Sequence, residues 1–162
     1  MYSGLAGELA KRIQKELINM ERIEKETFSA AETFAFAKDL AEKAAGGEVY
    51  CLDGDLGVGK TVFAQGFGAG LGITEPMASP TFTIRKDYTA GRLNLYHFDV
   101  YRIGSEDEME EIGFFDVTGR PDAVCLIEWS NLIEGILPED VIRVTIEKEP
   151  EKGFDFRRIT VE

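Results

Sequence analysis

The sequence predicts a single α/β domain in which helices flank a mixed central sheet. The chain has 162 residues, a length typical of one domain, and 44% of them are hydrophobic, which is enough for one core. Two short apolar runs, residues 48–53 and 123–127, are typical of strands buried on both faces of a sheet. Residues 141–147 and 154–161 alternate apolar and polar side chains, as half-exposed antiparallel strands do. Helical patterns lie between these runs, so both kinds of element belong to one domain.

The N-terminal segment predicts a helix that stands apart from this domain. Apolar residues recur there every four positions, which places them on one stripe of a helix. They are Leu5, Leu9, Ile13 and Leu17. We therefore divide the chain into a helical extension over residues 1–19 and a domain over residues 20–162. The extension is expected to dock on its own domain or on a neighbouring protein and to take no part in chemistry.

Two Ser-x-x-Glu sequences have the spacing of a capping box, in which two side chains satisfy the first free amides of a helix. The first, from Ser29 to Glu32, predicts a helix that ends at the glycine pair of residues 46–47. The second, from Ser105 to Glu108, predicts a short acidic helix. Both segments are therefore expected to begin with a side-chain cap.

A glycine-containing helix and a hairpin are predicted in the middle of the chain. Residues 61–71 form the predicted helix, although each internal glycine weakens a helix by up to about 1 kcal/mol relative to alanine. Close packing against the sheet is the expected compensation. Residues 81–88 and 92–101 are rich in β-prone side chains and are separated by a turn-forming break, so they predict a hairpin. The helix glycines are Gly66, Gly68 and Gly70.

Charge and cysteine content exclude several kinds of function. The chain has 18 Lys and Arg against 30 Asp and Glu, a net charge of −12, which excludes nucleic-acid binding driven by charge alone. Cys51 and Cys125 lie in apolar stretches and are expected to be buried, reduced thiols. With His97 they cannot complete a four-ligand zinc site, so any metal should be held by oxygen. Because the sequence has no apolar run of membrane-spanning length, we expect a cytoplasmic protein with no membrane partner.

The segment that carries the chemistry is residues 54–61, Gly-Asp-Leu-Gly-Val-Gly-Lys-Thr, which fits the P-loop pattern G-x-x-x-x-G-K-[ST]. A predicted buried strand precedes it and a predicted helix follows, so the fold is expected to be P-loop NTPase-like. In such a loop, backbone amides and the helix N-terminus surround the phosphates of a nucleotide. Lys60 is expected to reach the β- and γ-phosphates, and the Thr61 hydroxyl to bind Mg²⁺. The expected nucleotide contacts are Asp55, Leu56, Gly57, Val58, Gly59, Lys60, Thr61 and Val62.

Two carboxylates are candidates for catalytic work beside the triphosphate. Glu128 ends the second apolar run, where P-loop proteins commonly hold the acid linked to Mg²⁺. Asp99 lies in the segment His-Phe-Asp-Val-Tyr-Arg. On a strand, His97, Asp99 and Tyr101 share one face, from which they can hold metal, orient water or sense the γ-phosphate. Which acid does which work stays open, and Trp129 is interpreted as a packing residue.

Three further segments are candidates for nucleotide contacts. Ser79 and Thr81 follow the P-loop helix and are expected to close over the γ-phosphate and metal, as switch residues do. Residues 116–119, Asp-Val-Thr-Gly, match a switch motif of GTP-binding proteins, but no Asn-Lys-x-Asp segment is present to recognise guanine. We therefore interpret them as a loop. No pattern marks an adenine pocket, for which Thr27 and Ser29 are the candidates.

These motifs together resemble the TsaE family, bacterial P-loop ATPases required for the biosynthesis of threonylcarbamoyladenosine in tRNA. The resemblance rests on the P-loop, on Ser-Pro-Thr-Phe at residues 79–82, on the His-Phe-Asp-Val-Tyr-Arg segment and on the strand that ends in Glu-Trp. It implies ATP and Mg²⁺ as cofactors, and ATP hydrolysis that is weak alone and stimulated by a TsaB–TsaD complex. It also implies contact with tRNA only through that complex. By motif match, Lys60 and Thr61 bind phosphate and metal, and Asp99 and Glu128 are the functional acids.

Two other functions fit the same motifs. A small P-loop kinase would pass the γ-phosphate to a metabolite, although the arginines are scattered and predict no arginine-rich lid. A non-hydrolysing module would use ATP only to stabilise a partner-binding conformation. A phosphorylated metabolite would indicate the kinase, and ATP-dependent assembly without phosphate release would indicate the module.

Overall fold

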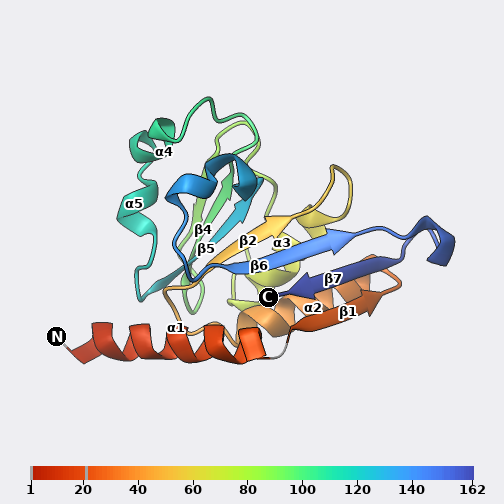
Figure 1. The fold of residues 1–162 in the computed structure, drawn as a ribbon, viewed down its shortest axis with the longest axis horizontal. Coiled ribbons are helices and arrows are strands. Elements are labelled where there is room, and N and C mark those ends of the chain that lie inside the picture. The colour runs from red at the N-terminus through yellow and green to blue at the C-terminus, as the bar shows by residue number, and fades with distance from the viewer. Residues whose placement is uncertain (1, 21) are drawn as a thin grey trace.

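The computed structural model, which describes residues 2–20 and 22–162, contains a seven-stranded mixed sheet flanked by helices (Figure 1). The strands are β1 (Ile23–Thr27), β2 (Val49–Asp53), β3 (Arg85–Tyr88), β4 (Asn94–Asp99), β5 (Ala123–Glu128), β6 (Ile142–Glu147) and β7 (Arg157–Val161). Across the sheet their order is β1-β7-β6-β2-β5-β4-β3. The predicted α/β domain with a mixed central sheet is confirmed.

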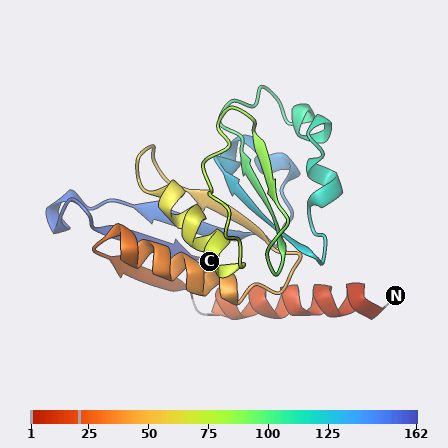
Figure 2. The same ribbon diagram turned by 180° about the vertical axis from the view of Figure 1, so that it is seen from behind.

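The helices are α1 (Tyr2–Met20), α2 (Ala30–Glu42), α3 (Lys60–Gly70), α4 (Asp107–Glu111) and α5 (Phe114–Val117), with 3-10 segments η1 (Ser130–Ile136) and η2 (Pro150–Lys152). Five of these seven elements cover the two faces of the sheet. Figure 2 shows α2 and α3 side by side against one face. Side chains of α4, α5 and η1 pack in the core on the other face. The sheet is therefore the middle of three layers.

The central strands are buried on both faces, which explains their continuous apolar sequences. β2 pairs in parallel with β5 and β6, and β5 pairs in parallel with β4. Every residue of β5 is buried. Leu126 lies in the core beneath α2 and α3, whereas Cys125 and Ile127 lie in the core beneath α4 and α5. Both predicted buried strands are confirmed, because a strand covered on two faces needs apolar side chains at successive positions.

Cys51 and Cys125 are buried free thiols in the core beneath α4 and α5. Burial is the main cause that raises the pKa of Cys51 to about 11 and that of Cys125 to about 12. Both thiols therefore stay protonated at neutral pH. The prediction of buried structural cysteines is confirmed.

The predicted C-terminal antiparallel pair is confirmed as β6 and β7, but its place in the sheet was not foreseen. β6 pairs antiparallel with β7 on one side and parallel with β2 on the other. β1 pairs antiparallel with β7 and forms an edge of the sheet. β1 was not predicted, because residues 24–26 are charged and exposed and so show no apolar alternation.

The predicted hairpin is confirmed as β3 and β4, which pair antiparallel. β3 begins only at Arg85, since residues 81–83 form a turn. The short helices α5 and η1 were not predicted. Segments of 4 and 7 residues contain too few periodic positions to show a helical pattern.

The two predicted capping boxes have different outcomes. Ser29 Oγ accepts a hydrogen bond from the Glu32 N–H at 3.1 Å, and Glu32 Oε2 accepts one from the Phe28 N–H at 2.8 Å. The first box is therefore confirmed. The second is wrong, because α4 has Glu106 at its N-cap and no side-chain capping bond, so Ser105 does not cap it. The Glu106 carboxylate instead accepts a hydrogen bond from a backbone N–H of η1.

The glycines of α3 allow this helix to approach α2 closely. A Cβ at Gly66 would lie 2.3 Å from the Phe34 carbonyl oxygen, and one at Gly70 would lie 2.3 Å from the Lys38 carbonyl oxygen. Both carbonyls belong to α2. These two glycines were expected to pack closely against the sheet. That expectation is wrong, because they pack against the backbone of α2 instead.

Helix α1 lies next to the N-terminal ends of β2, β5 and β6, where these strands begin (Figure 1). The Lys11 ammonium forms an ion pair with Asp140 at 3.2 Å, just before β6. A Cβ at Gly7 would lie 3.1 Å from the Cβ of Pro121, just before β5. The helix is thus attached at the strand starts, opposite the strand ends that carry the P-loop.

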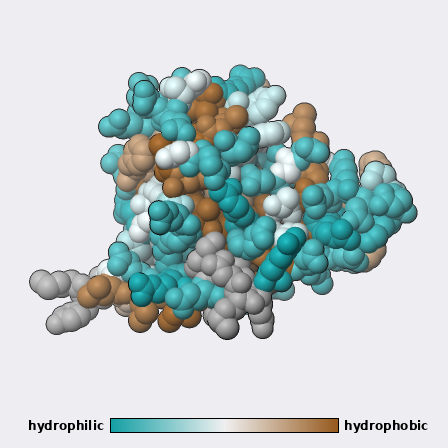
Figure 3. Space-filling model, viewed as in Figure 1, coloured by the Kyte–Doolittle hydropathy of each residue, from teal (hydrophilic) through white to brown (hydrophobic). Residues whose placement is uncertain are grey.

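The apolar stripe of α1 faces solvent. Leu5, Leu9 and Ile13 are 65%, 56% and 47% exposed, and Figure 3 shows apolar surface along this helix. The extension, expected to dock on its own domain or on a neighbouring protein, is thus attached to its own domain through Lys11 and Gly7, but not through these three apolar residues. The side chain of Leu17 lies outside the described set. The division of the chain at residue 19 stays a prediction. Within the described residues, no helix is long and apolar enough to cross a membrane.

We predict that Gly66→Ala lowers the free energy of unfolding by about 1–3 kcal/mol, because the added methyl group forces α2 and α3 apart. Urea unfolding followed by circular dichroism measures this change. Gly4→Ala is the control, since a Cβ there meets nothing within 4 Å. Equal unfolding midpoints for Gly66→Ala and wild type would contradict the close packing of the two helices.

Candidate functional site

The P-loop connects the end of β2 to the start of α3 and is shaped by its glycine backbone. Gly59 is the N-cap of α3 and has φ 107°, a left-handed conformation that favours glycine. The turn at Gly59 lets α3 begin at Lys60, so that the free amides of its first turn face the loop. The predicted strand–loop–helix context of the motif is confirmed.

The far end of the chain supports this loop. Arg157, on β7, donates a hydrogen bond from Nε to the Val58 carbonyl oxygen at 2.7 Å. Its Nη1 also donates to the Phe156 carbonyl oxygen at 2.7 Å. A guanidinium presents several donors in a fixed plane, so it can join two backbone segments at once. Sequence reasoning missed Arg157, because no local pattern connects β7 to the P-loop.

Lys60 is held at the inner side of the loop. Its Nζ donates a hydrogen bond to the Gly54 carbonyl oxygen at 2.7 Å and lies 3.9 Å from the centroid of the Trp129 ring. Burial lowers the pKa of Lys60, while the negative charges of Glu128 and Asp99 act to raise it. Trp129 is therefore more than the packing residue that the sequence suggested.

The two predicted acids lie side by side. Asp99 ends β4 and Glu128 ends β5, and the two residues are direct partners in the parallel register. Both are buried. Ser79 Oγ donates a hydrogen bond to Asp99 Oδ2 at 2.9 Å and lies 3.4 Å from Glu128 Oε2, and Thr81 Oγ1 donates to Asp99 Oδ2 at 3.2 Å. The structure thus brings both acids and both predicted switch residues together.

His97 lies within β4 beside Glu128, whereas Tyr101 lies beyond the end of the strand. His97 Nε2 lies 2.8 Å from Glu128 Oε2, in a pair whose side chains are 1% and 4% exposed. Tyr101 lies beyond the end of β4, where its N–H donates to Asp99 Oδ1 at 3.0 Å. Its ring contacts the indole of Trp129. The expectation that Tyr101 shares the strand face with His97 and Asp99 is therefore wrong, because the strand ends in a turn at Asp99.

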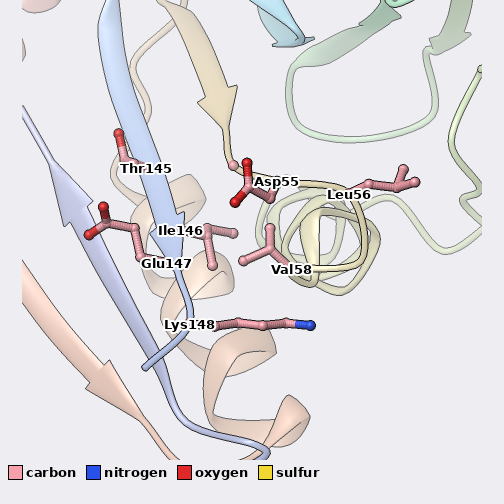
Figure 4. A pocket seen from close by; sticks show the side chains of 8 residues that line it. Asp55, Leu56, Val58, Thr145, Ile146, Glu147 and Lys148 are labelled. Carbon is pink, nitrogen blue, oxygen red and sulfur yellow. The ribbon is translucent and has the colours of Figure 1, made fainter. Parts of the chain in front are cut away.

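Three hollows border the P-loop within the described residues. The acid-side pocket, of about 320 Å³, is lined by Leu56, Gly57, Gly59, Lys60, Thr61, Val62, Ser79, Thr81, Asp99, Glu128 and Trp129. The helix-side pocket, of about 80 Å³, is lined by Ser29, Ala30, Thr33, Val58, Gly59, Val62, Asp155 and Arg157. The strand-side pocket, of about 330 Å³, lies between the loop and the end of β6 (Figure 4). The acid-side pocket therefore gathers most of the predicted site residues.

Asp55 and the two candidates for the adenine pocket lie outside the acid-side pocket. Asp55 lines the strand-side pocket, where Figure 4 shows Val58 beside Ile146 and Leu56 pointing away from β6. Ser29 lines the helix-side pocket. Thr27 is fully buried, and its hydroxyl lies 2.7 Å from that of Thr33. Thr27 therefore supports this pocket through Thr33.

The oxygen donors at the acid-side pocket suit a hard cation such as Mg²⁺. Asp99 and Glu128 provide carboxylate oxygens, and Ser79 and Thr61 provide hydroxyls that line the same pocket. No group of three or more His, Cys, Asp or Glu side chains among the described residues forms a metal site by itself. A divalent cation here would need further oxygens, which the phosphates of a nucleotide can supply.

Comparisons with known proteins agree on one family. The family model described as "Threonylcarbamoyl adenosine biosynthesis protein TsaE" matches residues 27–159. A tRNA threonylcarbamoyladenosine biosynthesis protein TsaE from Bacillus subtilis is 47% identical over 141 residues, which cover 87% of this chain and 85% of that protein. The protein of the same name from Haemophilus influenzae is 43% identical over 96 residues, 59% of this chain and 60% of that protein. The crystal structure of Bacillus subtilis YdiB matches with a TM-score of 0.70 and 42% identity, over 87% of this chain and 84% of YdiB.

We predict that His97→Phe lowers the free energy of unfolding by about 2–4 kcal/mol, because it leaves the Glu128 carboxylate buried without its nearest partner. The double variant His97→Phe/Glu128→Leu is expected to recover most of this loss, since neither polar group then remains. Urea unfolding of the two variants and wild type measures both effects. Full stability of His97→Phe would show that His97 does not compensate the buried carboxylate.

Proposed function

This chain belongs to the TsaE family of threonylcarbamoyl adenosine biosynthesis proteins, and we propose that it binds ATP with Mg²⁺ and hydrolyses it within the machinery that makes threonylcarbamoyladenosine in tRNA. The observation that carries the proposal is the acid-side pocket. There the P-loop lysine, a hydroxyl at the start of α3 and two buried carboxylates line one hollow. This combination suits a triphosphate and a divalent cation.

The P-loop residues are proposed to hold the phosphates. Backbone amides from Asp55 to Val62 would donate to phosphate oxygens, and the dipole of α3 favours negative charge at its N-terminus. The ammonium of Lys60 would neutralise charge on the β- and γ-phosphates. The nucleoside would extend toward the helix-side pocket, which lies on the other side of Gly59 and Val62.

The two acids are proposed to have separate roles. Thr61 and Glu128 would hold Mg²⁺, which when bound neutralises charge that develops on the transferred phosphoryl group. Asp99 would orient the attacking water and accept its proton. Because Ser79 and Thr81 now donate to Asp99, their hydroxyls would have to turn from this carboxylate toward the γ-phosphate. They would thus act as the predicted switch.

We propose the TsaB–TsaD complex as the protein partner, with tRNA bound only through that complex. The net charge of −12 disfavours direct binding of tRNA. Large apolar side chains are exposed beside the acid-side pocket, with Leu56 at 86% and Phe82 at 81%. Exposed apolar groups around a functional pocket suit a protein surface that covers it. Such a partner would exclude bulk water and enclose the attacking water beside Asp99, which would stimulate hydrolysis.

We predict that Lys60→Ala lowers the rate of ATP hydrolysis by about 100-fold or more, with and without TsaB–TsaD, because the main phosphate charge is then uncompensated. Phosphate release measures the rate, and Lys38→Ala, at an exposed position on α2, is the matched control. Turnover at the wild-type rate in Lys60→Ala would exclude the P-loop from the mechanism. ATP-dependent assembly without phosphate release would instead indicate the non-hydrolysing module, and a phosphorylated metabolite would indicate the kinase.

We also predict that Glu128→Gln and Asp99→Asn separate the two acids. Glu128→Gln should raise the Mg²⁺ concentration for half-maximal hydrolysis by about 10-fold or more, because a metal ligand loses its charge. Asp99→Asn should lower the maximal rate and leave the Mg²⁺ requirement within about 2-fold of wild type, because it removes a base. Magnesium titrations of ATP hydrolysis measure both quantities. An equal increase in the Mg²⁺ requirement for both variants would contradict this division of roles.

A further inference from the structure

Lys60 and Trp129 are in contact in a way that the proposed roles do not use. Lys60 is 7% exposed, and its Nζ has one carbonyl acceptor, Gly54, at 2.7 Å and the indole centroid at 3.9 Å. The face of an indole carries negative electrostatic potential and attracts a cation, most strongly where water is excluded. The ring therefore takes the place of water around this ammonium.

The buried acids lie near this cation without forming an ion pair with it. Among residues 2–20 and 22–162, no carboxylate oxygen lies within 4.0 Å of Lys60 Nζ. Glu128 and Asp99 nevertheless line the same pocket as Lys60. A poorly hydrated ammonium near carboxylates is strongly attracted to them. Instead of contacting the carbonyl and the indole, it could form a direct ion pair with one of the acids. An ion pair of that kind would occupy the lysine and an acid at the same time.

The backbone at Trp129 places the ring at this point. Trp129 has φ 62°, and it is one of only two non-glycine residues in the described part of the chain with a positive φ. Bulky residues rarely adopt this conformation unless their surroundings impose it, and such residues gather at functional sites. The turn comes directly after Glu128, at the end of β5. Tyr101 supports the same indole, with ring centroids 4.8 Å apart.

We propose that Trp129 is a positioning residue, which holds the Lys60 ammonium beside the P-loop and apart from Glu128 and Asp99 until phosphate arrives. In the nucleotide-free chain, the acids then stay available for a divalent cation and the lysine for phosphate. When phosphate binds, the Lys60 ammonium has to leave only the Trp129 ring and a carbonyl oxygen. Leaving these partners costs less free energy than breaking a buried ion pair. The effect on nucleotide binding rests on the proposed function, whereas the contact itself does not.

The first test uses the nucleotide-free protein. Trp129 is the only tryptophan in the chain, so emission excited at a wavelength that tyrosine does not absorb reports on its surroundings alone. Lys60→Met keeps the length of the side chain and removes the charge, and it is expected to change the intensity or wavelength of emission. Lys38→Met, at an exposed position on α2, should leave the spectrum unchanged. Identical spectra for Lys60→Met and wild type would overturn the contact, whatever ligand the protein binds.

The second test measures the dissociation constant of Mg·ADP by calorimetry. Trp129→Leu is expected to weaken binding by about 10-fold and Trp129→Phe by about 3-fold, following the strength of the cation–ring attraction. In a Lys60→Met background, the same Trp129 substitutions should change binding by less than about 2-fold, because their effect acts through the lysine. Equal losses in both backgrounds would indicate a merely structural role and overturn the proposal.

The two tests separate this inference from the proposed function. If wild type binds no Mg·ADP, the proposed function fails, and the fluorescence comparison still decides whether Trp129 holds Lys60. Circular dichroism verifies that each variant is folded. If Trp129→Leu does not fold, Trp129→Phe in the two Lys60 backgrounds decides the coupling, and a loss that is the same in both overturns it.

Discussion

The site depends on one constraint, which is that β2, β4 and β5 run parallel and end at the same edge of the sheet. In the register between β4 and β5, Asp99 lies opposite Glu128, and in the register between β2 and β5, Leu52 lies opposite Glu128. The P-loop begins two residues after Leu52, at Gly54. Ladder hydrogen bonds therefore place the loop beside both acids, more firmly than flexible loops alone could do.

Lys60, Asp99 and Glu128 bring three charged groups together in buried positions at these strand ends. Each group has different compensating partners. Glu128 has His97, and Lys60 has a carbonyl oxygen and an indole. Asp99 has the hydroxyls of Ser79 and Thr81. Hydroxyls and an aromatic ring are weaker partners than opposite charges, so a phosphate group and a divalent cation can replace them. Under the proposed function, these weaker partners leave the site ready for a nucleotide and a divalent cation.

Support for the P-loop comes from segments that are distant in sequence. Arg157 and Val58 are 99 residues apart and are joined by a hydrogen bond. On the other side of the loop, the backbones of α2 and α3 meet at Gly66, which sets the position of the helix that carries Lys60. α1 contributes to neither contact, because its described attachments lie where the strands begin. The loop and α1 therefore belong to opposite edges of the domain.

The two buried strands, the hairpin, the first capping box, the P-loop and the candidate acids are all predictable from the amino-acid sequence. Each of these is encoded by neighbouring residues, through apolar runs, turn chemistry or a motif whose function lies in its own backbone. Four other features are visible only in the folded chain: the place of β6, the existence of β1, the contact between Lys60 and Trp129, and the support from Arg157. These features depend on pairing between distant segments and on the backbone turn after each strand, for which no local pattern exists. Tyr101 is a further example. Its side chain does not share a strand face with His97 and Asp99, because β4 ends at Asp99, before the alternating pattern reaches Tyr101.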